Sequence, residues 1–165
     1  MHRKWLRLAG TVALAAALAA CSAGSVTGGR TAGGPGESAG RPTGAVTPGS
    51  EQDLQINVGD RVFFLEDSSA IGTEGLATLK RQAQWLNRHP QARITVEGHC
   101  DQRGTREYNL ALGYRRAHAV KDLLIADGVA ASRIRTISYG KERPAAVGSS
   151  EAAWAQNRRA VTVVE

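Results

Sequence analysis

The sequence predicts an α+β domain in which two helices pack on one side of a small, mixed, four-stranded sheet. Strand-like and helix-like segments follow one another in the order β-α-β-α-β-β, and all of them lie within residues 53–165. Two helices inserted between strands in this way pack most simply as one layer on the sheet. A segment of this length is also large enough to be held together by its own hydrophobic core.

The first strand and the first helix come from residues 61–87. Residues 61–66 (Arg-Val-Phe-Phe-Leu-Glu) are rich in aromatic and β-branched side chains, which favours a strand. Residues 73–87 place apolar residues at spacings of three and four, which predicts one buried helical face, and His89-Pro90 ends the helix. The expected buried face consists of Leu76, Leu79, Ala83 and Leu86.

The second strand and the second helix come from residues 94–127. Ile94, Val96 and Gly98 alternate with polar residues, as in a strand with one buried face. A long helix is expected from about Thr105 to Asp127, with Gly128 as its C-terminal stop. Its expected buried stripe consists of Leu110, Ala117, Val120 and Leu124.

The last two strands come from residues 134–139 and 160–164. The loop between them, about residues 140–157, contains a short helical stretch around Trp154. We expect Trp85 and Trp154 to pack within the domain and not to bind a ligand.

Residues 1–20 read as a signal peptide, with a basic start and a short apolar run. The run is shorter than the about 20 residues that a bilayer-spanning helix needs. Leu18-Ala19-Ala20-Cys21 resembles the lipobox of bacterial lipoproteins, so Cys21 is the expected lipidation site, and Ser22 after it favours the outer membrane. An ordinary cleaved signal peptide or an uncleaved anchor are the alternatives. Residues 21–52 form the expected flexible tether, since residues 22–50 contain nine Gly, three Pro and no apolar periodicity.

The charge distribution argues against a nucleic-acid partner. The formal charge is +6, but residues 51–165 contain 16 basic and 14 acidic residues, and most of the excess lies upstream. A domain so nearly balanced has no strong electrostatic reason to bind nucleic acid. If Cys21 carries lipid, Cys100 has no partner for a disulfide and behaves as a small apolar side chain.

The chemistry-bearing residues follow the second strand. Asp101 stands at the strand end, in a turn made permissive by Gly104, and Thr105 can cap the helix that follows. Asn109 and Arg116 lie two helical turns apart on nearly one face, with Arg116 leaning toward the turn of Asp101. Arg115 is rotated by about 100° from Arg116 and should be solvated. A carboxylate and a guanidinium so placed suit a ligand that bears both an ammonium and a carboxylate, although a structural Asp101–Arg116 salt bridge is the alternative.

Residues 98–117 (Gly-His-Cys-Asp-Gln-Arg-Gly-Thr-Arg-Glu-Tyr-Asn-Leu-Ala-Leu-Gly-Tyr-Arg-Arg-Ala) resemble the signature of OmpA-like peptidoglycan-binding domains. The resemblance is closer still to the peptidoglycan-associated lipoproteins of Tol–Pal systems. Residues 138–144 and 156–161 match these lipoproteins beyond the general signature, and the resemblance covers about residues 58–165.

The resemblance implies a role for several residues. In that family an Asp and an Arg hold the amine and the carboxylate of meso-diaminopimelate in peptidoglycan, and Asp101 and Arg116 occupy the matching positions. Asn109 and the turn Arg103-Gly104-Thr105 would line the site, and Asp67 matches an acidic family position. The implied protein is an outer-membrane lipoprotein facing the periplasm, without a cofactor. It would bind peptidoglycan, TolB and other Tol proteins, and support envelope integrity and invagination during cell division.

Three other functions compete with this one. A generic OmpA-like lipoprotein could staple the outer membrane to the wall without Tol partners. A hydrolase would use His99, Cys100 and Asp101, but neighbouring residues of a strand point to opposite faces and cannot form a catalytic pair directly. A zinc site lacks any recognised ligand spacing. We therefore expect neither catalysis nor a metal.

Overall fold

The structure is a computed structural model that describes residues 46–165. The expected signal peptide, Cys21 and most of the expected tether lie outside the described residues. The elements are α1 (Glu51–Asp53), the π-helical turn η1 (Leu54–Val58), β1 (Arg61–Phe63), α2 (Thr73–Arg88), β2 (Ile94–His99), α3 (Arg106–Ala126), the 3₁₀ turn η2 (Ala131–Arg133), β3 (Ile134–Gly140), α4 (Glu151–Asn157) and β4 (Arg159–Val164).

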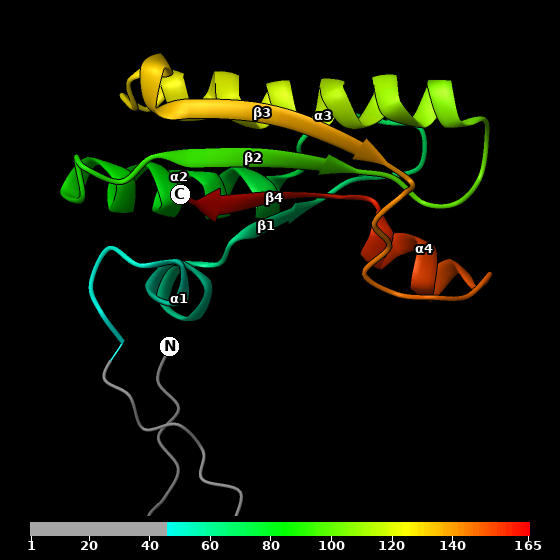
Figure 1. Ribbon diagram of the computed structural model, residues 1–165, viewed down its shortest axis with the longest axis horizontal. Helices are drawn as coiled ribbons and strands as arrows, with labels where there is room; N and C mark the ends of the chain where they lie inside the picture. Colours follow the sequence, from blue (N-terminus) through cyan, green and yellow to red (C-terminus); the bar gives the residue numbers. More distant parts are fainter. Residues whose placement is uncertain (1–45) are drawn as a thin grey trace, which may run out of the picture. The chain divides into compact units, whose positions relative to one another are not determined.

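The sheet has the order β1-β4-β2-β3 and is mixed, as the sequence predicts. β2 and β3 run parallel, whereas β4 is inserted between β1 and β2 and runs antiparallel to both. The long helices α2 and α3 lie together behind the sheet in Figure 1, and α4 stands at the end where β3 finishes and β4 begins. The predicted α+β class with two helices on one face of the sheet is confirmed.

The core forms between this helical layer and the sheet. Ile94 and Val96 of β2 are completely buried and Thr95 and Glu97 are partly exposed, so the predicted alternation is confirmed as far as Gly98; it is wrong at His99, which is buried. The side chains of the core are Leu54, Val62, Phe64, Leu79, Ala83, Trp85, Leu86, Ile94, Val96, Ala117, Val120, Leu124, Val129, Ile134 and Ala160.

Two predicted core residues are wrong. Leu76 and Leu110 are 45% and 44% exposed, respectively. On α2, Gly75 takes the buried position because the helix packs closely on β1: a Cβ at Gly75 would lie 2.4 Å from Cγ1 of Val62. On α3, the buried stripe runs through Asn109, Leu112, Gly113, Arg116, Ala117, Val120 and Leu124. In the first half of this helix, a rule that places apolar residues inside therefore selects the wrong face as the buried one.

The segment before β1 is helical, which the sequence does not predict. α1 begins at Glu51, and the side chain of Ser50 caps it by accepting from the Asp53 amide. The Asp53 carboxylate accepts from Nε1 of Trp85 at 2.8 Å, so this buried indole has a partner and packs as expected. Hydrogen bonds from Asn57, the Gly49 backbone and Trp85 lower the pKa of Asp53 to about 2. The hydrogen bond between Asp53 and Trp85 holds α1 against α2.

The closest approach of α3 to the sheet occurs at two glycines. A Cβ on Gly98 of β2 would lie 1.8 Å from the carbonyl oxygen of Gly113 on α3. Only a residue without a side chain allows the helix to cross the strand there. The first half of α3 is thereby held against the end of β2, where Asp101 follows.

Within residues 46–165, no helix is both long and apolar enough to span a bilayer. Cys100 is a buried free thiol. Its Sγ donates to the Asn109 carbonyl oxygen at 3.3 Å, so it packs as a small side chain between β2 and α3.

Candidate functional site

A cavity of about 220 Å³ lies where the segment after β1, the turn after β2 and the first half of α3 meet. Its walls are formed by Glu66, Asp67, Cys100, Asp101, Arg103, Gly104, Tyr108, Asn109, Leu112 and Arg116. Six of the seven ligand-binding residues expected from the sequence are among them. The exception is Thr105, which is exposed and does not line the cavity.

The turn is built by local hydrogen bonds that the sequence already suggests. Gly104 has φ +80°, and Thr105 caps α3 by accepting from the Tyr108 amide at 3.2 Å. The Asn109 side chain, buried one turn later, donates to the carbonyl oxygens of Arg103 and Thr105 at 2.6 and 3.0 Å. Asn109 and Thr105 therefore hold the turn in place.

Asp101 is 7% exposed, and its carboxylate accepts four hydrogen bonds. Oδ1 accepts from the backbone N and the Nε of Arg103 at 3.1 and 3.2 Å. Oδ2 accepts from Nη2 of Arg103 at 2.6 Å and from Nη1 of Arg158 at 3.4 Å. Burial by itself raises the pKa of Asp101, but the hydrogen bonds and charge of Arg103, with the hydrogen bond of Arg158, bring it below the ordinary value. Asp101 is thus ionised at neutral pH.

Arg103 links this carboxylate to the rim of the cavity. Its Nη1 lies 2.7 Å from Oε1 of Glu66, and its guanidinium stacks 4.2 Å above the ring of Trp154. The hydrogen bond to Asp101 raises the pKa of Arg103, so its charge is permanent. Trp154 packs under this side chain, as expected.

Arg116 is completely covered by protein. Its Nε donates to the Ser68 carbonyl oxygen at 2.8 Å, Nη1 to that of His99 at 2.8 Å, and Nη2 to that of Leu65 at 3.0 Å. Burial lowers the pKa of Arg116, but a guanidinium remains protonated at any physiological pH.

The predicted alternative of a structural Asp101–Arg116 salt bridge is therefore wrong. Among the described residues, Asp101 pairs with Arg103 and Arg158, and Arg116 donates to backbone carbonyls. Of the five N–H groups of the Arg116 guanidinium, three have these acceptors, which leaves one on each terminal nitrogen. Arg115, by contrast, is exposed, as expected.

Three residues of the site escape sequence reasoning. Tyr108 and Glu66 line the cavity, and the hydroxyl of Tyr108 donates to Asp67, which joins the two walls. Asp67 has φ +51°, a conformation that Asp tolerates better than most residues. Arg158 reaches Asp101 from the C-terminal cap of α4, directly before β4 and 57 residues further along the chain. No local pattern reveals Arg158, because only the antiparallel pairing of β4 brings it to the site.

Comparisons with known proteins agree with this geometry. The family model described as "OmpA family" matches residues 63–158. This chain belongs to the OmpA family. A protein of Agrobacterium fabrum named "Peptidoglycan-associated lipoprotein" is 62% identical over 121 residues, which cover 73% of this chain and 68% of that protein. A protein of the same name from Legionella pneumophila is 44% identical over 118 residues, 72% of this chain and 67% of that protein.

Solved structures show the same relationship. The crystal structure of the peptidoglycan-associated lipoprotein from Burkholderia pseudomallei aligns with a TM-score of 0.63 at 46% identity, covering 64% of this chain and 90% of that one. The C-terminal domain of Helicobacter pylori MotB aligns with a TM-score of 0.60 at 25% identity, covering 64% and 84%. The chain thus belongs, within the OmpA family, with the peptidoglycan-associated lipoproteins.

Membership of the OmpA family makes this chain a structural protein and not an enzyme. The hydrolase alternative also fails on geometry. Cys100 lines the cavity, whereas His99 stacks on Tyr139 with ring centroids 5.5 Å apart and lies 3.4 Å from Glu97. Burial raises the pKa of the Cys100 thiol, which disfavours the nucleophilic thiolate.

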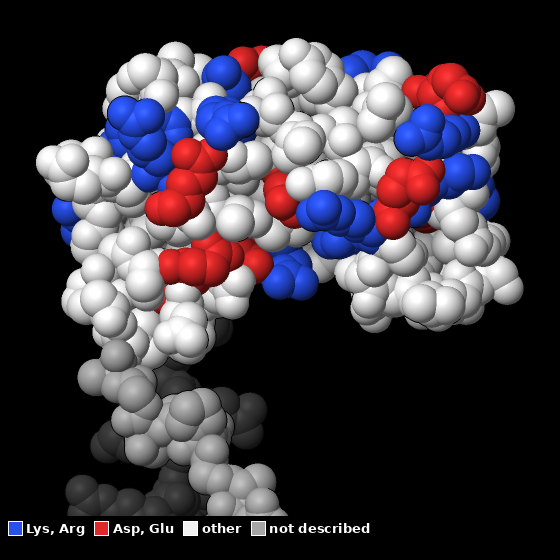
Figure 2. Space-filling model, viewed as in Figure 1, with Lys and Arg blue, Asp and Glu red and all other residues white. Residues whose placement is uncertain are grey.

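Neither the side chains of residues 46–165 nor the face shown in Figure 2 suggests a site for a metal or a polyanion. Among residues 46–165, no group of three or more His, Cys, Asp or Glu side chains is placed to hold a metal ion. On the face seen in Figure 2, acidic and basic side chains are interspersed, without an extended area of one sign. This face offers no basic surface for nucleic acid.

Proposed function

We propose that the cavity binds the meso-diaminopimelate residue of a peptidoglycan stem peptide. Asp101 would accept hydrogen bonds from the ligand's ammonium, and Arg116 would donate to its carboxylate. The observation that carries this proposal is that Asp101 and Arg116 line one cavity without pairing with each other. Each of the two charges is bonded to other groups of the protein, and Arg116 is completely covered, so a zwitterion would reach both only after these contacts rearrange.

The contacts suggest how the ligand enters. A carboxylate has about four acceptor sites, and four donors already occupy those of Asp101. The ammonium must therefore displace a donor, and Arg103 is the more exposed of the two side-chain partners, at 32% against 7% for Arg158. Arg103 retains Glu66 and Trp154 as alternative partners. The carboxylate would take the two remaining N–H groups of Arg116, once the segment carrying Asp67 moves away from Tyr108.

The relatives extend the proposal to the whole chain. Proteins 62% and 44% identical to it are named peptidoglycan-associated lipoproteins. We propose that residues 1–20 are removed as a signal peptide and that Cys21 carries lipid in the outer membrane, with residues 21–52 as a tether. Each buried CH₂ of an acyl chain contributes about 0.8 kcal/mol, so several chains anchor firmly. The domain would face the periplasm, bind TolB and act in the Tol–Pal system during division.

Sedimentation with purified peptidoglycan tests the wall-binding proposal. The chain without its first 45 residues should co-sediment with diaminopimelate-containing peptidoglycan, and Asp101→Asn, which keeps the shape of the side chain, should lose most of this binding. Arg115→Ala is the matched control, since this neighbouring arginine is exposed and lies outside the cavity. Equal loss in both variants would indicate nonspecific charge attraction and would contradict the proposed site.

Two further experiments separate the anchoring and partner proposals. Cys21→Ser should move the protein from membrane to soluble fractions, and a variant that stays in the membrane would refute lipidation. Co-purification with TolB distinguishes a Tol–Pal protein from a generic wall staple, which would bind peptidoglycan but give no TolB complex.

A further inference from the structure

The outer edge of β1 has no strand beside it. β1 is the edge strand of the sheet, and it pairs only with β4. The Phe64 amide donates to Arg158 and the Asp60 carbonyl oxygen accepts from Thr162, so the even-numbered residues face β4. Because alternate residues of a strand direct their backbone groups to opposite sides, those of Arg61 and Phe63 point outward.

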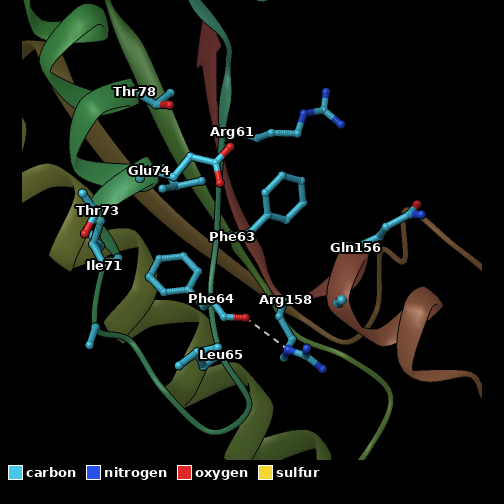
Figure 3. Close-up of a pocket in the computed structure, with 15 residues that line it drawn as sticks. Arg61, Phe63, Phe64, Leu65, Ile71, Thr73, Glu74, Thr78, Gln156 and Arg158 are labelled. Atoms are coloured by element: carbon cyan, nitrogen blue, oxygen red, sulfur yellow. Dashed lines mark hydrogen bonds between the residues drawn. The ribbon is translucent and has the colours of Figure 1, made fainter. Parts of the chain in front are cut away.

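This edge forms the floor of the larger of the two cavities described here, about 650 Å³. Figure 3 shows β1 between the start of α2 and the end of α4, with the Phe63 ring on one side and Ile71 on the other. We call this space the β1 groove. It is lined by Arg61, Val62, Phe63, Phe64, Leu65, Ala70, Ile71, Gly72, Thr73, Glu74, Gly75, Thr78, Ala155, Gln156 and Arg158.

The groove exposes apolar side chains beside the unpaired backbone. Phe63 is 53% exposed and Leu65 is 77% exposed. Gly72 adds open space, since a Cβ there would have no atom within 4 Å. An exposed strand edge next to apolar side chains is a template for another strand, and proteins normally cover such edges.

The position of the edge selects the kind of strand that can pair with it. The β1 of a second copy would lie between its own α2 and α4, so two such recessed edges cannot approach each other to strand spacing. A single extended peptide has no such walls. It can enter the groove and place alternate side chains against Phe63 and against Ile71.

The charges of the groove select the peptide's composition. Arg61 is held by Asp60 at 2.8 Å, and Arg158 is held by Asp101 and Glu151. Glu74, in the first turn of α2, has no ion pair among residues 46–165. The groove is therefore apolar with one uncompensated negative charge.

We propose that the β1 groove binds an extended segment of another protein, which adds a strand to the edge of β1. The segment alternates apolar and small polar residues and carries a Lys or Arg that faces Glu74. Its backbone pairs with Arg61 and Phe63, and its apolar side chains cover Phe63 and Ile71. This surface shares no lining residue with the cavity around Arg116, although Leu65 and Arg158 contact Arg116 and Asp101, so it gives the domain a second partner site beside the first.

A designed peptide tests the proposal by fluorescence anisotropy. The probe is a labelled eight-residue peptide of alternating Val and Thr with one Lys next to an end, made in two versions with the Lys at either end. One version should bind the domain saturably. Methylation of alternate backbone nitrogens along the pairing edge should weaken binding about tenfold or more, because it removes strand hydrogen bonds and leaves the side chains unchanged.

Glu74→Gln should weaken binding of the Lys peptide about two- to fivefold, as expected for an exposed ion pair. Lys80→Gln is the matched control, since Lys80 is an exposed residue of α2 outside the groove, and should leave binding unchanged. The proposal is overturned if neither peptide binds at millimolar concentration, or if the methylated peptide binds equally well. Self-association of the domain that blocks the peptide would also overturn it, since a second copy would then be the occupant.

Discussion

Both halves of α3 have a buried face, but the two faces consist of different kinds of side chain. In the second half, Ala117, Val120 and Leu124 are completely buried in the hydrophobic core. In the first half, the buried positions include Asn109 and Arg116, whose polar groups bond to the end of β2, to the turn after it and to the segment after β1. The comparison teaches that polar residues on the buried face of an otherwise amphipathic helix mark where the fold builds a site instead of a core.

The polar half is stable because its buried groups have partners. A buried polar group without a hydrogen bond costs about 1–3 kcal/mol. Arg116 avoids this cost through three carbonyl oxygens, and in return it fixes the segment after β1 to the end of β2. Arg116 is thus part of the scaffold, and we expect its side chain to contribute to stability as well as to the proposed binding.

Leu124→Ala should show the largest loss of stability and leave the site intact. Removing a buried Leu side chain typically costs about 2–5 kcal/mol, and Leu124 is completely buried. Urea unfolding measures the loss, and peptidoglycan sedimentation below the unfolding transition should match wild type. Loss of binding by the folded variant would show that the two halves are not separate in function.

Arg116→Ala should affect both properties. It removes the proposed carboxylate partner and leaves the carbonyl oxygens of Leu65, Ser68 and His99 without this donor, which should cost about 2–4 kcal/mol in total. Binding and urea unfolding must therefore be measured together, at a temperature where the variant is folded. A variant as stable as wild type would contradict the anchoring role of this side chain.

The buried His99, at the end of β2, should make the free energy of unfolding depend on pH. Its burial, with the nearby Arg159 and Arg143, lowers its pKa to about 4 from 6.5. The unfolded chain therefore takes up this proton first, so the stability contributed by neutral His99 is present above pH 6.5 and is lost as the pH falls toward 4, by up to about 3 kcal/mol.

Urea unfolding at pH 7, 6, 5 and 4.5, compared between wild type and His99→Phe, measures this contribution. The variant should show a much flatter dependence over this range. Parallel curves for the two proteins would mean that other groups cause the pH dependence.

Thr105→Ala should have the smallest effect, and only on stability. Loss of the hydroxyl that accepts from the Tyr108 amide should cost about 1 kcal/mol, as for other helix caps. Sedimentation with peptidoglycan should be unchanged, because Thr105 does not line the cavity. A strong loss of binding would place Thr105 in the site after all.

These contrasts explain how far the sequence predicts the structure. The alternation in β2 and the cap and stop of α3 are local signals, and they predict the elements correctly. Leu110 is misplaced because polar Asn109 occupies the buried face that an apolar pattern assigns to leucine. β1 is predicted too long because the chain leaves the sheet after Phe64, and the next carbonyl, that of Leu65, accepts from Arg116, which lies 51 residues further along the chain.

The site shows the same difference between residues with a local sequence signal and residues placed by long-range contacts. Asp101, Asn109 and Arg116 lie within one continuous stretch, so the motif that resembles OmpA-like domains reveals them. Arg158 contacts Asp101 only because β4 pairs antiparallel with β2, and the sequence has no local signal for that contact. The motif also does not show that Asp101 pairs with Arg103 and Arg158 instead of Arg116.

Calorimetric titration with two soluble stem tripeptides tests the central claim most directly. One ends in meso-diaminopimelate, and the other ends in lysine, which has the same side-chain amine but lacks the second carboxylate. If Asp101 and Arg116 hold the two ends of a zwitterion, the lysine peptide should bind about ten- to hundredfold more weakly, as expected for losing charged hydrogen bonds to Arg116. Equal affinity for the two peptides would contradict the proposed site.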